Sequence, residues 1–391
     1  MDISFYEVII PKLRALANSI KEPGYMKYLE KAKNSWTPLI NKTPKPPAIV
    51  YGVDGGSRGV DFKGFTIGLA TAISVGYVFE GNVYKVLEPM KTAFVGKIIP
   101  PVDVNERVNL YREILEGKIA VHSCKNNALV LMDGSISSIL VRPRPSPRAK
   151  GRYMIIDDVI NSIKNNDNDY FKELAACIDK TLSSISDLNE TPICSSLMQP
   201  SALDRELYDV ASVVIEYLEK LYVYGRLLER VINGSCKLIF IAKTSHSREI
   251  FESNYPDIFI FEKLTKTPGR SIEVLKRLAE YKDLPISILE EEFAKPLEMF
   301  LVAGSLYSYM RLEENGPVLK VEIIGDYMEL QHNEADLLDE IYSMLLAISN
   351  NGYPHPLRIA HIDSHITYSD VEKILRLLGL DIEVTGREVL E

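Results

Sequence analysis

Two apolar segments of the chain end in the same way, and this ending constrains the fold more than any other feature of the sequence. The first segment ends as Val53-Asp54-Gly55-Gly56-Ser57 and the second as Leu131-Met132-Asp133-Gly134-Ser135. A short apolar run bounded by turn residues predicts a buried strand. Each strand would therefore deliver a carboxylate to the end of a sheet, beside a glycine that leaves room for a ligand. The simpler alternative is that Asp-Gly only begins a turn, but its recurrence with a following serine favours a shared site.

The composition indicates a globular protein large enough for one big domain or two ordinary ones. The chain has 391 residues, of which 46% are hydrophobic and 25% charged. No segment approaches the roughly 20 apolar residues that cross a bilayer, and charges within residues 1–21 exclude a signal peptide. A net charge of -9 argues against a protein whose whole surface binds nucleic acid. It is compatible with a local basic groove on an acidic protein.

The four cysteines are scattered without any C-x-x-C pair. This spacing favours buried thiols in a reducing compartment over disulfides or a zinc site. We therefore expect a cytoplasmic protein.

The order of the predicted elements indicates a mixed α/β fold that follows an N-terminal helical extension. Two helical pieces within residues 3–34 precede a Pro-rich linker at 41–47, and the sheet begins at 48. An antiparallel meander is expected first, with strands at 48–54, 65–79 and 83–87. Further strands are expected at 129–133 and 237–242, and weaker ones near 257–261, 299–303 and 319–324. Helices are expected at 104–120, from 204 or 205 to 232, at 333–349 and at 369–378.

The span 141–203 lacks a clear hydrophobic pattern. Residues 142–152 are basic and Pro-rich, and residues 161–189 are rich in Asn, Asp and Ser. We interpret the span as an inserted, flexible segment or a mobile flap. The expected domains are then residues 1–47, the helical segment with its linker, and residues 48–391.

The helix at 104–120 offers two glutamates to the strand ends. At 3.6 residues per turn, Glu116 falls at the border of the apolar stripe and Glu113 falls opposite it. A residue at the border of a helix that packs on a sheet reaches the strand ends, whereas one on the far side faces solvent. Glu116 is therefore the predicted ligand, and Glu113 the predicted surface charge.

The carboxylates Asp54, Glu116 and Asp133 suit a hard divalent cation, which takes oxygen ligands. Such ions activate water and neutralise phosphate oxygens during phosphodiester hydrolysis. His361, which ends the segment Gly352–His361, is a candidate ligand for a second ion or a proton carrier. The alternative is a histidine hydrogen-bonded within a loop, and His355 and His365 are competing candidates.

These segments together resemble the NurA family of archaeal DNA-end-processing nucleases. The motifs that carry the resemblance are Val53-Asp54-Gly55, Arg112-x-x-x-Glu116, Leu131 to Ser135, Ala242-Lys243-Thr244-Ser245, and Gly352-Tyr353-Pro354 with Ala360-His361. The resemblance implies an RNase H-like fold, in which helices flank a mixed central sheet. It implies catalytic roles for Asp54, Glu116, Asp133, Tyr353 and His361, of which all except Tyr353 bind metal.

The same resemblance implies a cofactor, an activity and partners. The cofactor is one or two Mn²⁺ ions, with Mg²⁺ as an alternative. The activity is that of a 5′-to-3′ exonuclease on DNA ends and an endonuclease on single strands. The partners are DNA, a second copy of the chain, and a hexameric HerA-type translocase that acts with the nuclease in end resection for recombinational repair.

Basic residues supply candidate DNA contacts. Lys243 follows a strand and could meet a phosphate, or it is a solvated terminal lysine. Arg142 and Arg144 begin a basic run that continues through Arg148, Lys150 and Arg152. Such a run could bind the phosphates of a DNA backbone electrostatically. The alternative, which is more common for a charged Pro-rich loop, is that the charges only keep the loop in solvent.

Two other classes compete with the nuclease. Asp54-Gly55-Gly56 resembles the phosphate turn of actin-like sugar kinases, but the second glycine-rich turn and the late Gly-Gly motif of those ATP-dependent enzymes are missing. A diverged relative that binds DNA or a translocase without cutting is the non-enzymatic alternative. Its surface would not need converging carboxylates.

Overall fold

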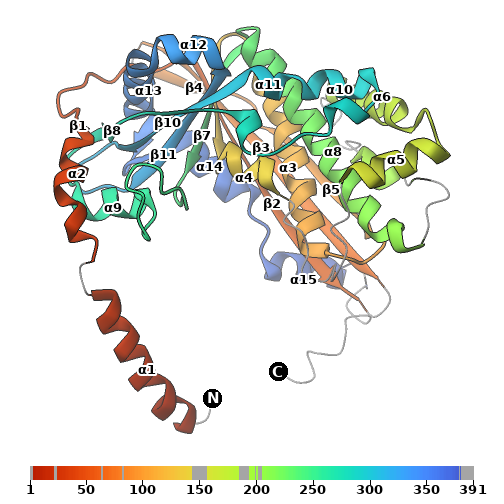
Figure 1. Cartoon of the computed structure of the whole chain (residues 1–391), viewed down its shortest axis with the longest axis horizontal. Coiled ribbons are helices and arrows are strands. Elements are labelled where there is room, and N and C mark those ends of the chain that lie inside the picture. Colours follow the sequence, from red (N-terminus) through yellow and green to blue (C-terminus); the bar gives the residue numbers. More distant parts are fainter. Residues whose placement is uncertain are drawn as a thin grey trace.

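The computed structural model describes residues 3–21, 24–62, 65–81, 83–142, 156–184, 193–198, 200, 205–377 and 379. Figure 1 shows the arrangement of its helices and strands. The strands are β1 (Trp36–Pro38), β2 (Ile49–Asp61), β3 (Thr66–Glu80), β4 (Val83–Val86), β5 (Met90–Ile98), β6 (Ala128–Asp133), β7 (Cys236–Ala242), β8 (Gly269–Ser271), β9 (Val274–Arg277), β10 (Ala303–Arg311), β11 (Val318–Asp326), β12 (Ser349–Asn350) and β13 (Tyr353–Pro354). The helices are α1 (Ile3–Lys21), α2 (Leu29–Asn34), α3 (Val104–Ser123), α4 (Ile136–Val141), α5 (Ile156–Asn166), α6 (Tyr170–Ser183), α7 (Cys194–Leu197), α8 (Arg205–Ile232), α9 (Asp257–Leu264), α10 (Glu291–Leu297), α11 (Met299–Val302), α12 (Tyr327–His332), α13 (Glu334–Ile348), α14 (His355–Ser364) and α15 (Tyr368–Leu377).

A large mixed sheet organises the chain, as the sequence predicted. The strand order is β1-β8-β10-β11-β7-β6-β2-β3-β4, with β5 paired to β3 and β9 paired to β10. The central strands β2, β6 and β7 run parallel, and the strands that flank them pair antiparallel. Parallel strands are normally covered on both faces, which accounts for the continuous apolar run of β6.

Helices cover both faces of this sheet (Figure 1). One face packs against α3 and α8, together with residues from α4, α5, α6 and α10, in the largest apolar core. The other face packs against α13 and α14 around Leu129, Ile239 and Val321. A smaller core joins α2 and α9 to β10.

The first part of the sheet forms the predicted antiparallel meander, because β2 pairs with β3 and β3 with β4. Two predicted strands are wrong. Residues 257–261 belong to α9, and residues 299–302 form α11 immediately before β10. Short apolar runs do not distinguish a strand from a buried helix, so the tertiary packing decided their conformation. The strands β5 and β10 and the helix α14 were not predicted.

The flap expected at 141–203 is wrong for the residues that the structure describes. Helices α5 and α6 bury apolar side chains in the largest core, among them Ile160, Ile163, Phe171, Leu174 and Ile178. Both helices have one apolar face, which the abundance of Asn, Asp and Ser between the apolar positions obscured. The segments 143–155 and 185–192 lie outside the described residues.

Two disulfides replace the four expected thiols. Cys124, after α3, is bonded to Cys236 at the start of β7, and Cys177 on α6 is bonded to Cys194 on α7. The partners are 112 and 17 residues apart in the sequence. No local motif indicates these pairs, because the packing of the elements is what brings the sulfur atoms together.

The N-terminal helical extension contains α1 and α2. Figure 1 shows α1 extending away from the body, whereas α2 lies beside α9. None of the helices in the described residues is long and apolar enough to cross a membrane.

Candidate metal centre at the ends of β2 and β6

Asp54 and Asp133 occupy matching positions on two neighbouring parallel strands. The pairing of β2 with β6 runs from Val50 opposite Leu129 to Val53 opposite Met132, so each aspartate follows the last pair. Beyond this point β2 continues to Asp61 with β3 as its partner. The edge of β2 that faces β6 is therefore open from Asp54 onward. The Gly55 N–H on this edge donates to Asp54 Oδ1 at 2.8 Å.

Helix α14 brings His361 to the same place. The helix packs closely on one face of β2, because a Cβ atom at Gly52 would lie 2.4 Å from the Pro356 carbonyl carbon, and one at Gly56 would lie 2.1 Å from the Ser364 oxygen. Glycine is thus required at both positions. The packing places His361 Nδ1 2.7 Å from Asp54 Oδ2. Glycines two residues either side of Asp54, on the same face of the strand, were the sequence signal for this helix.

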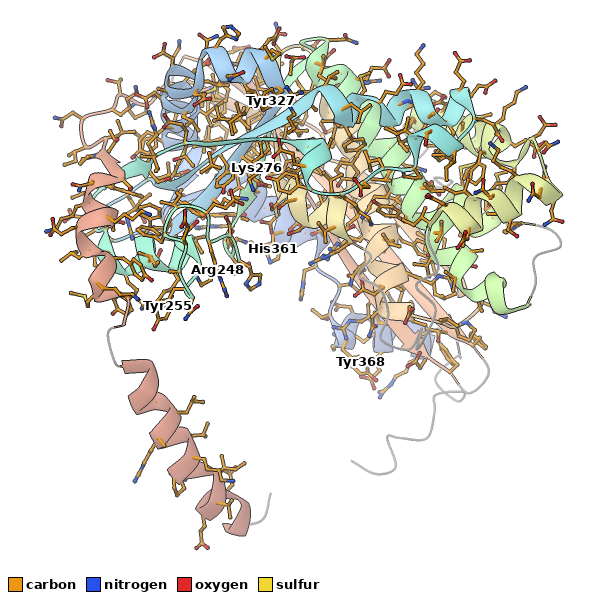
Figure 2. All side chains as sticks on the ribbon, in the orientation of Figure 1. Arg248, Tyr255, Lys276, Tyr327, His361 and Tyr368 are labelled. Atoms are coloured by element: carbon orange, nitrogen blue, oxygen red, sulfur yellow. A yellow bond between two sulfur atoms is a disulfide. The ribbon has the colours of Figure 1, made fainter. Side chains whose placement is uncertain are left out.

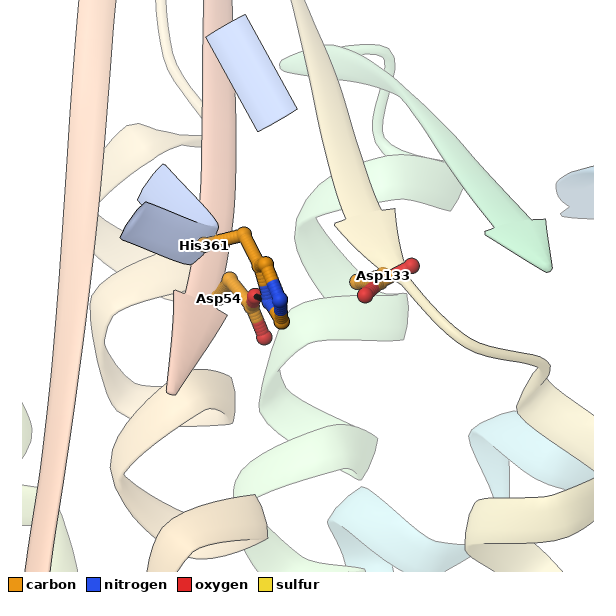
Figure 3. Close-up of side chains that lie close together, drawn as sticks. All are labelled: Asp54, Asp133 and His361. Atoms are coloured by element: carbon orange, nitrogen blue, oxygen red, sulfur yellow. Dashed lines mark hydrogen bonds and ion pairs between the residues drawn. The ribbon is translucent and has the colours of Figure 1, made fainter. Parts of the chain in front are cut away.

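The three side chains converge on one point (Figure 3). Ligand atoms of Asp54, Asp133 and His361 all lie within 4.8 Å of one another. Two carboxylates and one imidazole form a donor set that suits Mn²⁺, which accepts both oxygen and nitrogen ligands. The donor chemistry of the site therefore fits a divalent cation.

Tyr353 and Lys243 surround Asp133. The Tyr353 hydroxyl donates to Asp133 Oδ1 at 3.2 Å, and Lys243 Nζ lies 3.7 Å from Asp133 Oδ2. The same Nζ lies 4.4 Å from the centroid of the Tyr353 ring. Tyr353 thereby holds Asp133, while Lys243 adds a partly exposed positive charge at the rim.

Glu116 lies beside this trio on the opposite face of β2. A Cβ atom at Gly55 would lie 2.7 Å from Glu116 Oε1, so the carboxylate reaches the open edge of the strand. Burial raises the pKa of Glu116 to about 8, with added repulsion from Asp54 and Asp133, although the Arg112 guanidinium opposes this rise. Arg112 Nε lies 3.3 Å from Glu116 Oε1. The charges of the two aspartates therefore act electrostatically on Glu116, although Glu116 is not one of the three residues that converge.

Burial also raises the pKa of Asp54, and the charge of Asp133 raises it further. The hydrogen bonds from His361 and from the Gly55 backbone act in the opposite direction. The negative charges of the aspartates thus raise the pKa of Glu116, and that of Asp133 raises the pKa of Asp54, as expected at a site of high negative potential. A cation is the natural counterpart of such a site.

Glu113 is not a surface charge, contrary to the prediction. Its side chain is buried, with Lys220 Nζ at 3.1 Å from Oε2, and Arg142 Nη1 at 3.2 Å and Arg112 Nη2 at 3.8 Å from Oε1. Helix α8 covers the face of α3 that a single amphipathic stripe would leave in water. The breadth of apolar and aromatic residues on α8 is explained by burial within the chain, since Tyr217, Tyr222 and Tyr224 are all buried.

The remaining predicted contacts are only partly described. Arg142 follows α4, where its half-exposed side chain pairs with Glu113 and its carbonyl oxygen accepts from Lys220 Nζ at 2.7 Å. Arg144, Arg148, Lys150 and Arg152 lie outside the described residues. His355 begins α14, and the exposed His365 follows its end, with its ring centroid 6.2 Å from that of His361.

The protein is therefore a mixed α/β protein. It carries a candidate site for a divalent cation, made of carboxylates and an imidazole, at the open edge of its sheet. The family model for the NurA domain matches residues 48–366. The chain therefore belongs to the NurA family.

Relatives in sequence include the probable DNA double-strand break repair nuclease NurA of Methanocaldococcus jannaschii. It is 27% identical over 340 residues, which cover 84% of this chain and 78% of that protein. The DNA double-strand break repair nuclease NurA of Saccharolobus solfataricus is 26% identical over 380 residues, covering 95% of this chain and 94% of that protein.

Solved structures share the fold. The NurA nuclease from Sulfolobus solfataricus has a TM-score of 0.64 and 21% identity, and the match covers 97% of each chain. A crystal structure of NurA bound to dAMP and manganese has a TM-score of 0.66 and 17% identity, also covering 97% of each chain.

Proposed function

We propose that this chain is a manganese-dependent deoxyribonuclease that hydrolyses DNA phosphodiesters at the open edge of β2. One observation carries the proposal, namely the convergence of Asp54, Asp133 and His361 within 4.8 Å. The named relatives are repair nucleases, and one solved NurA structure contains dAMP and manganese. Both facts support the same reading of this site.

The residues divide the chemistry among them. A divalent cation held by Asp54, Asp133 and His361 would supply a polarised water and neutralise phosphate charge. Glu116 joins the ligand set when its carboxyl loses the proton that burial favours. Tyr353 fixes the orientation of Asp133 through its 3.2 Å hydrogen bond. Lys243, at the rim, donates to a phosphate oxygen of the DNA.

The finer activity follows the family resemblance. We propose a 5′-to-3′ exonuclease that also cuts single strands internally and takes part in end resection in the cytoplasm. A homodimer of this chain would work with a hexameric HerA-type translocase, and Mg²⁺ is an alternative cofactor. Arg142 and Arg144 are proposed contacts to the DNA backbone.

The test compares single- and double-stranded DNA, labelled at either the 5′ or the 3′ end, with Mn²⁺, with Mg²⁺ and with EDTA. Early release of a 5′-labelled mononucleotide supports the proposed polarity, and release of a 3′-labelled one contradicts it. The double variant Asp54→Asn/Asp133→Asn is expected to be inactive. The control Asp336→Asn, at an exposed position in the first turn of α13, is expected to retain activity.

Three outcomes would redirect the proposal. Equal inertness of the wild type and the double variant in every metal would favour the binding protein that does not cut. Turnover that requires ATP and a sugar would favour the kinase. Failure to bind a HerA-type hexamer in sedimentation experiments would remove the partner and leave the nuclease chemistry intact.

A further inference from the structure

The segment from α14 to α15 follows one face of β2 beyond the metal centre. Alternate residues of a strand point to the same face, and every second residue of β2 from position 52 to 58 contacts this segment. The contacting pairs are Gly52 with Pro356, Asp54 with His361, Gly56 with Ser364, and Arg58 with Tyr368. The pair Arg58–Tyr368 is therefore the continuation of the pair Asp54–His361 along the same surface.

Tyr368 and Arg58 combine an exposed ring with an uncompensated charge. Tyr368 is 56% exposed, and the Arg58 guanidinium lies 5.6 Å from its ring centroid. Within the described part of the chain, no carboxylate lies within 4.0 Å of this guanidinium, and its buried Nε has no hydrogen-bond partner. Figure 2 shows Tyr368 below and to the right of His361.

We propose that Arg58 and Tyr368 form a nucleotide subsite for a single DNA strand that passes through the metal centre. A base stacks on the Tyr368 ring, and Arg58 neutralises the adjoining phosphate. Aromatic stacking accepts any base, and a nearby cation strengthens it. The proposal rests on the proposed nuclease function, because the occupant is the strand that this function would cleave.

The position of the subsite sets the length of strand that it serves. Arg58 lies four residue steps beyond Asp54 on β2, a distance of about 13 Å at about 3.3 Å per residue. A stacked strand advances about 3.4 Å per nucleotide, so this distance corresponds to about four nucleotides, and to fewer in an extended strand. A dinucleotide bound at the metal centre is then too short to reach the subsite in either conformation.

The other face of β2 does not offer an equivalent route. A hollow of about 420 Å³ lies there between the end of β2 and the start of α3, and its lining includes Asp61, Asp103 and Glu106. Three carboxylates repel a phosphate backbone. A strand that leaves the centre is thus directed along the side of α14 and α15.

Of the two subsite residues, Arg58 lies within the part of the chain that the family model matches, and Tyr368 lies just beyond it. The NurA domain match ends at residue 366, two residues before Tyr368. Ile366 leads from α14 toward α15 and contacts the space above Gly56, where an added Cβ would lie 3.3 Å from its Cγ1. Val371 on α15 is buried. Tyr368 thus lies in the sequence between Ile366, which packs over β2, and the buried Val371.

The test measures binding of fluorescein-labelled dT2 and dT12 to the full chain in EDTA, where no cleavage occurs. Tyr368→Leu is expected to reduce the preference for dT12 over dT2 by about 5- to 150-fold, the range measured for single stacked bases. Tyr368→Phe keeps the ring and should keep the preference. Arg58→Gln should make the negative slope of log affinity against log salt shallower by about 0.7, as expected for one lost phosphate contact.

The matched control is Tyr84→Leu, which removes a tyrosine of similar exposure (57%) from β4, on the other side of β3 from β2. It should leave the preference unchanged, and thermal unfolding would verify that every variant is folded. An unchanged preference in folded Tyr368→Leu overturns the subsite. Absence of Mn²⁺-dependent cleavage by the wild type would instead overturn the nuclease, since binding in EDTA does not depend on catalysis.

Discussion

The Nδ1 atom of His361 lies 2.7 Å from Oδ2 of Asp54, which joins α14 to β2 across 307 residues of sequence. Asp133 completes the group from the neighbouring strand β6. The relationship depends on the close packing of α14 over Gly52 and Gly56. The candidate metal centre is therefore built jointly by the sheet and by a helix from the C-terminal part of the chain.

Asp54→Asn should weaken Mn²⁺ binding by on the order of 10- to 100-fold or more, because it removes a charged ligand from the trio. Isothermal titration calorimetry of the full chain measures this affinity directly. Asp336→Asn is the matched control and should bind Mn²⁺ as the wild type does. An unchanged affinity in Asp54→Asn would place the cation elsewhere.

Glu116 should make the stability of the metal-free protein fall with rising pH. Its pKa is about 8 in the folded protein and 4.5 in the reference state. Between these values the folded chain retains a proton that the unfolded chain has lost, so this group's contribution to the free energy of unfolding decreases as the pH rises. The change is on the order of a few kcal/mol.

Glu116→Gln removes that dependence. Denaturant unfolding in EDTA at several pH values should therefore show a difference in favour of the variant that grows from about pH 5 to about pH 8. Parallel pH profiles for the wild type and Glu116→Gln would mean that the carboxyl is already ionised in the folded state.

Glu113→Gln should destabilise the fold by about 3–5 kcal/mol, because it leaves the buried Lys220 ammonium without its carboxylate. Adding Lys220→Met should recover part of the loss, since both charges are then gone. Urea unfolding measures both effects. The control Glu372→Gln breaks a pair with Arg376 in which the side chains are 46% and 65% exposed, and it should cost less than about 1 kcal/mol.

Loss of the Cys124–Cys236 disulfide should cost more stability than loss of Cys177–Cys194. The chain-entropy model assigns the loop closed over 112 residues about 1.7 kcal/mol more than the loop closed over 17. Denaturant unfolding of the two double Cys→Ser variants tests this order. Thiol titration of the unfolded, unreduced wild type should find no free cysteine, and four free thiols would restore the interpretation from the sequence.

The sequence alone determined the elements whose burial pattern is local. The continuous apolar run of β6 and the turn residues after Asp54 and Asp133 indicated two strand ends that carry carboxylates. Helical periodicity then placed Glu116 near them. These predictions needed only the period of the side chains along one element.

The tertiary structure decided everything that depends on one element covering another. It placed His361 on α14, buried Glu113 under α8 and paired the cysteines. It also packed α5 and α6 into the core, where the sequence indicated a flap. The reason is physical: a residue's own periodicity shows which side of its element is apolar, but not which distant segment will cover the other side. Asp54 could thus be found from its strand, whereas its contact with His361 arises only when residues 307 positions apart pack together.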